Sequence, residues 1–167
     1  DFYGTTFRKI QVEKSIFEEY VGFEDCLFGD KDKRSRDDTV IFKHTTFNDY
    51  GNFRNTKFHS GLDIELINYK SAANFLGAEI YTKYSKRETF RIIKDSLDQI
   101  GNHIEANKYF KQEMEKYKDE LTKLKRDPKW VMLKINEMLS DFGQSYTKPI
   151  KILICAVTVL ASLKYVH

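Results

Sequence analysis

The sequence contains few of the residues on which covalent frameworks and many active sites depend. It has two cysteines, Cys26 and Cys155, four histidines and one tryptophan in 167 residues. The cysteines lie in different segments, so we expect no disulfide, which fits a reducing, cytoplasmic setting. No histidine has a cysteine or carboxylate at metal-ligand spacing, and no phosphate-binding glycine motif or nucleophile elbow is present. We therefore expect no catalytic residue, cofactor or metal, and expect that the chain is not an enzyme.

The charges are nearly balanced. The 28 Lys and Arg residues stand against 25 Asp and Glu residues, for a net charge of +3. This excess is too small to indicate nucleic-acid binding by itself, and basic residues are not interleaved with exposed aromatics. We expect no nucleic-acid partner. The sequence begins at Asp1 without Met and ends in an apolar run, so we expect a fragment of a longer polypeptide.

Large side chains, mostly phenylalanines, recur about every five residues in the first half of the chain. They are Phe2, Phe7, Val12, Phe17, Phe23, Phe28, Phe42, Phe47, Phe53, Phe58, Phe75 and Ile80. Small or short residues stand two places before most of them: Thr5, Ser15, Val21, Cys26, Val40, Thr45, Gly51, Thr56, Ala73 and Ala78. This period fits neither a helix nor a strand. It fits a coil with four short sides, in which each side places one large and one small residue inside and each coil pairs with the next.

The segment Ala73-Asn74-Phe75-Leu76-Gly77 resembles the pentapeptide-repeat family, whose motif is A-(D/N)-(L/F)-x-x. The other repeats keep the large residue but vary the Ala and Asn positions. The resemblance covers residues 1–80 and implies a mainly β solenoid, a right-handed quadrilateral β-helix. The alternative is an ordinary Phe-rich antiparallel β domain, but the alternation of apolar and polar residues that such strands need is poor.

Residues 29–39 interrupt the repeat with charged residues and almost no apolar side chain. Such a segment cannot bury itself, so we expect a solvated, mobile loop inserted in one coil. One interpretation is a plain surface insertion. The other is a partner-docking loop that touches anionic lipid through Lys31, Lys33, Arg34 and Arg36, although the aspartates of the loop nearly cancel this charge.

Several polar residues between the repeat positions are candidates for function. His44 and His59 fall immediately outside repeat positions, so we expect both to face solvent. Asp49, Asp63 and Glu65 could be arranged as an acid and a base. Alternating carboxylates on a solenoid face are ordinarily solubilising, and this is the role that we expect for them.

Residues 81–126 show helical spacing and indicate a helical hairpin. Ser85 and Glu88 have the spacing of a capping box at the start of the first helix. Gly101 is placed to end that helix, and Asn102 with Glu105 begins the second in the same way. The stripe of the second helix is Ala106, Phe110, Met114, Tyr117, Leu121 and Leu124. We expect the hairpin to cap the open end of the solenoid, with its second helix packed on its partner or paired with another chain as a homo-oligomer.

The C-terminal part is apolar in two segments. Residues 129–142 indicate an amphipathic juxtamembrane helix, and residues 149–167 a hydrophobic helix that we expect to begin a transmembrane span. The apolar run has only twelve residues, whereas a bilayer crossing needs about 20. The membrane-interface candidates are Trp130, Tyr146, Lys148 and Lys151, whose types suit the headgroup region. The alternative is a buried C-terminal helix of a soluble protein.

The order of these segments is similar to that of bacterial membrane-anchored pentapeptide-repeat proteins. The hairpin contributes to this resemblance through Phe90, Arg91, Lys94, Gly101, Asn102, Glu105, Ala106, Phe110, Glu113, Met114 and Glu115. The following joint contributes Ser140, Asp141, Gly143, Ser145 and Pro149.

The resemblance implies a protein at the bacterial inner membrane, with the repeats in the cytoplasm and the C-terminal segment in contact with lipid. We expect a non-enzymatic, membrane-tethered scaffold that binds a protein partner whose identity the sequence does not give. One alternative is the cytoplasmic regulatory domain of an ion channel or transporter whose pore lies outside this sequence. Another is a topoisomerase-binding DNA mimic, but that function needs a long acidic rod, and residues 1–80 mix both signs of charge.

Overall fold

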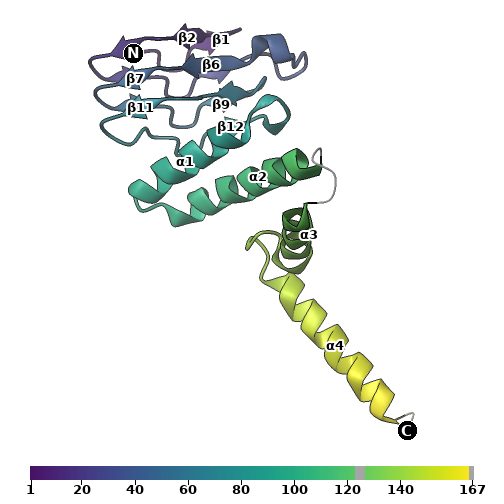
Figure 1. The fold of residues 1–167 in the computed structure, drawn as a ribbon. Helices are drawn as coiled ribbons and strands as arrows, with labels where there is room; N and C mark the ends of the chain where they lie inside the picture. The colour runs from purple at the N-terminus through teal and green to yellow at the C-terminus, as the bar shows by residue number, and fades with distance from the viewer. Residues whose placement is uncertain (123–126, 166–167) are drawn as a thin grey trace. The chain divides into compact units, whose positions relative to one another are not determined.

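A computed structural model describes residues 1–122 and 127–165, with side chains described as far as Ser162. The chain divides into two compact units, Asp1–Glu113 and Met114–His167. Helix α2 (His103–Thr122) contributes to both units. The first unit contains short strands followed by helices, and the second contains the end of α2 with two further helices (Figure 1).

The strands of the first unit are two to four residues long and form four parallel sheets. They are β1 (Thr6–Phe7), β2 (Gln11–Glu13), β3 (Ile16–Phe17), β4 (Val21–Gly22), β5 (Leu27–Phe28), β6 (Val40–Lys43), β7 (Thr46–Phe47), β8 (Gly51–Asn52), β9 (Lys57–Phe58), β10 (Leu62–Asp63), β11 (Asn68–Tyr69) and β12 (Glu79–Ile80). Sheet A has the order β1-β5-β9-β12, sheet B β10-β6-β2, sheet C β11-β7-β3 and sheet D β4-β8.

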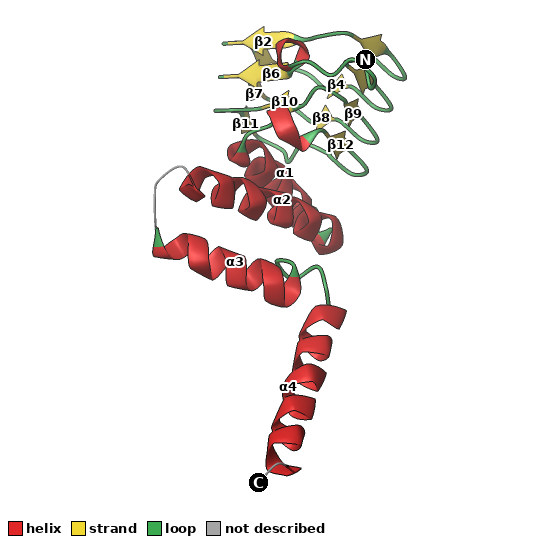
Figure 2. Cartoon of the chain, turned by 90° about the vertical axis from the view of Figure 1, so that its right-hand side faces the viewer, coloured by secondary structure: helices red, strands yellow, loops and turns green. Residues whose placement is uncertain are grey.

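All pairings between these strands are parallel, so the antiparallel alternative is wrong. Parallel sheets of short strands followed by helices are compatible with a repeat β-solenoid (Figure 2). The register also locates the inserted loop. Ile41 pairs with Asp63, 22 residues later, whereas Gln11 pairs with Ile41, 30 residues later, across the segment 29–39.

Phenylalanine rings from successive layers stack in columns inside the sheets. Phe23 stacks on Phe53 with ring centroids 5.3 Å apart, and Phe53 stacks on Phe75 at 4.9 Å. A second column places Phe28 on Phe58 at 5.1 Å with the rings 2° from parallel. All five rings are buried. The five-residue interval therefore creates the core, because it places a large side chain beside each sheet in turn and so returns one to the same column in the next layer.

Small polar residues bind backbone groups of the layer before them. The Cys26 thiol donates to the carbonyl of Phe2, the Thr56 hydroxyl donates to that of Phe23, and both residues are fully buried. Their positions admit only short side chains, as the sequence pattern predicts. These hydrogen bonds satisfy carbonyl groups that would otherwise be costly to bury.

Helix α1 (Arg87–Gln99) packs on the last layers of the first unit. Its residues Phe90, Ile93 and Leu97 are fully buried and belong to the same core as the phenylalanine columns. The Thr89 hydroxyl also donates to the carbonyl of Leu62 at 3.1 Å. The prediction that Ser85 caps α1 is wrong, because Lys86 is the N-cap. The Ser85 hydroxyl is instead used by the sheet, where it accepts a hydrogen bond of 3.0 Å from the Leu62 amide.

The connection between α1 and α2 forms as the sequence predicts. Gly101 has a φ of +77°, and its amide donates to the carbonyl of Asp98 at 3.0 Å. The side-chain oxygen of Asn102 accepts a hydrogen bond from the Glu105 amide at 3.2 Å, which caps α2. Within the first unit, Ala106 of α2 is buried in the core. Pairing of two chains through the rest of α2 stays a prediction, and Leu124 of its stripe lies outside the described residues.

The second unit contains helix α3 (Pro128–Ser140) and helix α4 (Thr147–Tyr165). Helix α3 begins one residue earlier than the expected segment 129–142, because the Asp127 carboxylate caps it by accepting from the Lys129 amide at 2.8 Å. It ends two residues earlier, since Asp141 and Phe142 adopt left-handed conformations. Helix α4 begins before Pro149, which proline permits in a first turn. Residues 166–167 of the expected segment 149–167 lie outside the described residues.

Candidate functional site

The joint between α3 and α4, residues 141–146, contains Tyr146 of the four membrane-interface candidates and precedes Lys148. Its backbone turns through three consecutive left-handed residues, Asp141, Phe142 and Gly143, with φ values of 54°, 55° and 84°. A bulky residue seldom adopts this conformation, and it persists where the surroundings hold it. The Phe142 side chain is buried, with only 3% of its surface exposed, so packing holds this strained turn.

Two serines tie the joint together. The Ser140 hydroxyl accepts a hydrogen bond from the Gly143 amide at 3.1 Å, and the Ser140 carbonyl accepts one from the Ser145 amide at 2.9 Å. The Ser145 hydroxyl accepts from the Lys148 amide at 3.2 Å, in the first turn of α4. The spaced motif of Ser140, Asp141, Gly143 and Ser145 is therefore a structural joint that ends one helix and starts the next.

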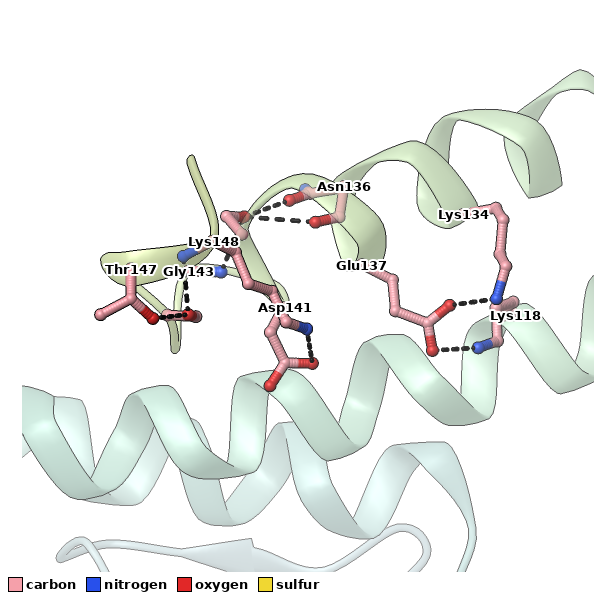
Figure 3. A network of polar contacts seen from close by, with 10 residues as sticks. Lys118, Lys134, Asn136, Glu137, Asp141, Gly143, Thr147 and Lys148 are labelled. Carbon is pink, nitrogen blue, oxygen red and sulfur yellow. Dashed lines mark hydrogen bonds and ion pairs between the residues drawn. The ribbon is translucent and has the colours of Figure 1, made fainter. Parts of the chain in front are cut away.

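Ion pairs brace the same region (Figure 3). Lys148 lies 3.6 Å from the Asp141 carboxylate, across the joint. Glu137 of α3 binds two lysines, Lys118 of α2 at 2.7 Å and Lys134 of α3 at 2.9 Å. Hydrogen bonds from these two ammonium groups lower the pKa of Glu137 to about 2. Glu137 therefore stays ionised at any physiological pH and links α2 to α3 within the second unit.

The structure places the four membrane-interface candidates in different settings. Trp130 is half-buried, and its indole N–H donates to the Thr122 hydroxyl at 3.0 Å. Tyr146 is 85% exposed, Lys148 is held by Asp141, and Lys151 is exposed near the start of α4. Lys148 and Lys151 are three residues apart and share one side of the helix. Within the described residues, Trp130 makes no hydrogen bond or ion pair with the other three.

Helix α4 exposes every side chain that the structure describes, from Thr147 to Ser162. Its large apolar residues are 40–67% exposed: Ile150, Ile152, Leu153, Ile154, Val157, Val159 and Leu160. The alternative of a buried C-terminal helix therefore does not hold for the described residues.

The expected start of a transmembrane span is not found. No helix of the described residues combines the length and the apolarity that crossing a membrane requires. Twelve apolar residues extend about 18 Å as a helix, against about 30 Å for the hydrocarbon core.

A charged cluster in the first unit differs from its predicted, solvent-facing arrangement. Asp63 is buried, with 6% of its surface exposed, although it was expected on a solvated face. Its carboxylate lies 3.1 Å from Lys86 and 3.6 Å from Lys43, and Glu65 contacts the same two lysines. The hydrogen bond from Lys86 lowers the pKa of Glu65. Ion pairs with lysines balance the negative charge of both carboxylates and connect the start of α1 to sheet B. Carboxylates stabilised in their ionised form in this way are poorly suited to general acid–base catalysis.

The solvent exposure of His59 also differs from the prediction. It is half-buried, whereas His44 is exposed as predicted. Burial, with Arg34 and Lys31 nearby, lowers the pKa of His59, so its imidazole is neutral at pH 7. Among the described residues, no group of His, Cys, Asp and Glu side chains is arranged to hold a metal ion.

Comparisons with family models, curated proteins and solved structures find no match to this chain.

Proposed function

We propose that the chain is a non-enzymatic, membrane-tethered protein-interaction module. In this proposal the first unit is a right-handed, four-sided solenoid of the pentapeptide-repeat type, and α4 is the tether. The solenoid is supported by the order of the strands. From β1 to β12 the chain visits sheets A, B, C and D in turn, and the bridge between Asn52 and Asn74 supplies the D position of the third layer.

The exposed apolar surface of α4 is the single observation on which the proposed membrane tether rests. An isolated helix with this surface is unfavourable in water, because contiguous exposed apolar area favours burial against lipid or protein. Lys148 and Lys151 lie before the apolar run, where their ammonium groups would meet headgroup phosphates. The segment order adds the cellular setting, the cytoplasmic face of a bacterial inner membrane.

The outward faces of the sheets would provide the partner surface. Tyr20 and Tyr50 stack on this outer surface with ring centroids 6.2 Å apart, and Tyr20 is 41% exposed. Tyrosines of this kind are enriched among the residues that dominate protein–protein binding. The rigid core beneath them keeps the ordering cost of binding small.

The tether is tested by flotation of the full chain with vesicles that contain one fifth phosphatidylglycerol in phosphatidylcholine. The wild-type chain is expected to float with the vesicles. The variant Leu153→Ser/Val157→Ser/Leu160→Ser removes three apolar side chains that lie on one side of α4 and are 57–67% exposed. It should lose more than about tenfold in partitioning, because each apolar group contributes on the order of 1 kcal/mol or more to insertion.

The matched control is Ile16→Ser/Ile104→Ser, which removes two apolar side chains of the first unit that are 61% and 77% exposed. This variant should float like the wild type. The proposed tether is wrong if the wild-type chain stays with the soluble fraction, or if the control loses as much partitioning as the α4 variant.

A further inference from the structure

The inserted loop of residues 29–39 is held against sheet A by contacts at both ends. The Gly29 amide donates to the Phe7 carbonyl at 2.8 Å, and the Thr39 hydroxyl donates to the Ser60 carbonyl at 2.9 Å. In the middle of the loop, the Arg34 guanidinium lies over the Tyr81 ring, 4.3 Å from its centroid. These contacts connect both ends and the middle of the charged loop to the layers beside it.

A cleft of about 680 Å³ lies between this loop and sheet A. Phe7 and Leu27 of the sheet give it an apolar floor, and His59 of the next layer lies beside them. Arg8, Lys31 and Lys33 line its walls. This volume is within the range of about 300–1,000 Å³ that small-molecule sites occupy.

The cations of the cleft are only partly neutralised. Arg8 pairs with Asp38 at 3.5 Å, but its side chain is 89% exposed. The other carboxylate of the cleft, Asp30, accepts hydrogen bonds from the backbone amides of Asp32 and Lys33, so it is occupied in shaping the loop. Within the described residues, the ammonium groups of Lys31 and Lys33 make no ion pair. The cleft therefore has two cations without an ion pair and one that is weakly paired, and its three cations exceed its two carboxylates, Asp30 and Asp38, by one charge.

The donors of the cleft match a phosphate group better than a carboxylate. Two ammonium groups and one guanidinium offer hydrogen bonds in several directions, and the neutral imidazole of His59 can add one more N–H. A phosphate monoester carries close to two negative charges at pH 7 and three strong acceptor oxygens. The apolar floor beside these donors suits an organic substituent on the phosphate.

We propose that this cleft binds a phosphate monoester, with its phosphate group held by Arg8, Lys31 and Lys33 and its apolar or planar substituent on Phe7 and Leu27. The same chemistry is offered by a small soluble ester and by the headgroup of a phosphatidic acid. This site is independent of the tether, because it lies wholly in the first unit.

Phenyl phosphate is the soluble probe, titrated into the full chain and followed by the NMR signals of the backbone amides in residues 29–39. If the source is a soluble ester, these signals shift to saturation, whereas phenol at the same concentration leaves them unchanged. The variant Lys31→Ala/Lys33→Ala should then bind at least about tenfold more weakly, since each hydrogen bond to a charged group contributes roughly 1.5–3 kcal/mol. The matched control Lys9→Ala/Lys70→Ala removes two exposed lysines outside the cleft and should change binding less than about twofold.

Vesicles of phosphatidic acid in phosphatidylcholine provide the second arm, compared with phosphatidylcholine alone. If the source is a lipid headgroup, the wild-type chain binds the acidic vesicles in excess, and only the Lys31→Ala/Lys33→Ala variant loses this excess. Saturable binding of phenyl phosphate without a lysine-dependent vesicle effect identifies a soluble ester. The proposal is overturned if neither arm shows binding, or if the double variant binds as tightly as the control.

Discussion

The hydroxyl of Tyr109 donates a hydrogen bond of 2.6 Å to the carbonyl oxygen of Ala78. It joins α2 to the segment that precedes β12, within the first unit. Tyr109 is 5% exposed and Ala78 is half-buried, so this contact is partly shielded from water. A helix thereby satisfies a partly buried backbone acceptor of the last layer.

Tyr109→Phe removes this hydrogen bond while keeping the ring. We expect the free energy of unfolding of the first unit to fall by about 1–2 kcal/mol, because the partly buried Ala78 carbonyl loses this hydrogen bond. Urea unfolding followed by far-UV circular dichroism measures the change. Tyr3→Phe is the matched control, since Tyr3 is 69% exposed and its loss should change stability by less than about 0.5 kcal/mol. Equal effects of the two substitutions would show that the hydrogen bond between Tyr109 and Ala78 does not stabilise the first unit.

The same tyrosine predicts a loss of stability in alkali. Burial raises the pKa of Tyr109 above its ordinary value of 10, so the folded state keeps the protonated hydroxyl that the hydrogen bond needs. The sign follows from proton linkage: the contribution is fully present below the unfolded pKa of about 10 and is lost as pH rises above it. The stability difference between wild type and Tyr109→Phe should therefore shrink between about pH 10 and pH 11.5. A difference that stays constant over this range would show that Tyr109 ionises freely.

The repetitive half of the chain could be predicted because its large and small residues are set by stacking. Phe23, Phe53 and Phe75 occupy one column, so their spacing in the sequence directly reflects the layers in space. The end of α1 and the N-cap of α2 were also predictable, because Gly101 and Asn102 act on neighbouring backbone groups. Such local interactions depend on short-range sequence alone.

The parts that escaped prediction depend on contacts between distant residues. Ser85 has the sequence signature of a helix cap, but its hydroxyl binds Leu62 in another layer. Asp63 has a polar signature, yet it is buried and pairs with Lys86, the N-cap of α1. Arg8, Lys31 and His59 line the same cleft beside the inserted loop, although they are far apart in the sequence. They become neighbours only through the pairing register of the strands.

Gly29 starts the inserted loop in a conformation that other residues rarely adopt. Its φ is +78°, and a Cβ at this position would lie 2.8 Å from the Ser60 hydroxyl and 3.2 Å from the Ser60 amide. Gly4 has a similar φ of +62°, but a Cβ there would meet nothing within 4 Å. Gly29→Ala should therefore destabilise the first unit by about 1–2 kcal/mol more than Gly4→Ala, because only Gly29→Ala adds a clash to the backbone strain. Equal melting temperatures for the two variants would show that the loop is not held against Ser60.

The column of Phe23, Phe53 and Phe75 gives a prediction about the core. Phe53 is 1% exposed and stacks on a ring on either side, whereas Phe2 lies at the end of the same column and is 43% exposed. Phe53→Ala should lower the free energy of unfolding of the first unit by about 3–5 kcal/mol, and Phe2→Ala should lower it by less than half as much. Phe53→Leu should recover part of the loss, because it refills most of the cavity. Chemical unfolding of the three variants measures this order, and a loss for Phe2→Ala as large as that for Phe53→Ala would contradict the column.

Glu137 predicts how acid affects the second unit. Lys118 and Lys134 lower its pKa to about 2, so the folded state favours the ionised carboxylate. Its contribution to stability is therefore present above the unfolded pKa of about 4.5 and is lost as the pH falls toward 2. Trp130, the single tryptophan, lies on the same helix, so its fluorescence reports the unfolding of α3 in wild type and in Glu137→Gln. The wild-type chain should be the more stable by up to about 1 kcal/mol at pH 7, and the two should converge only as the pH approaches 2.

The two lysines also allow the cause of the Glu137 shift to be separated from its position in the helix. Lys118→Met removes the hydrogen bond that lowers this pKa most, so the carboxyl signal of Glu137 in NMR should titrate closer to its ordinary value of 4.5. Lys129→Met is the matched control, because Lys129 is exposed on α3 and its ammonium group makes no ion pair within the described residues. It should leave the titration of Glu137 near pH 2. If both variants shift the titration equally, the positive charge of nearby lysines in general accounts for the lowered pKa of Glu137. The ion pair with Lys118 then makes no specific contribution.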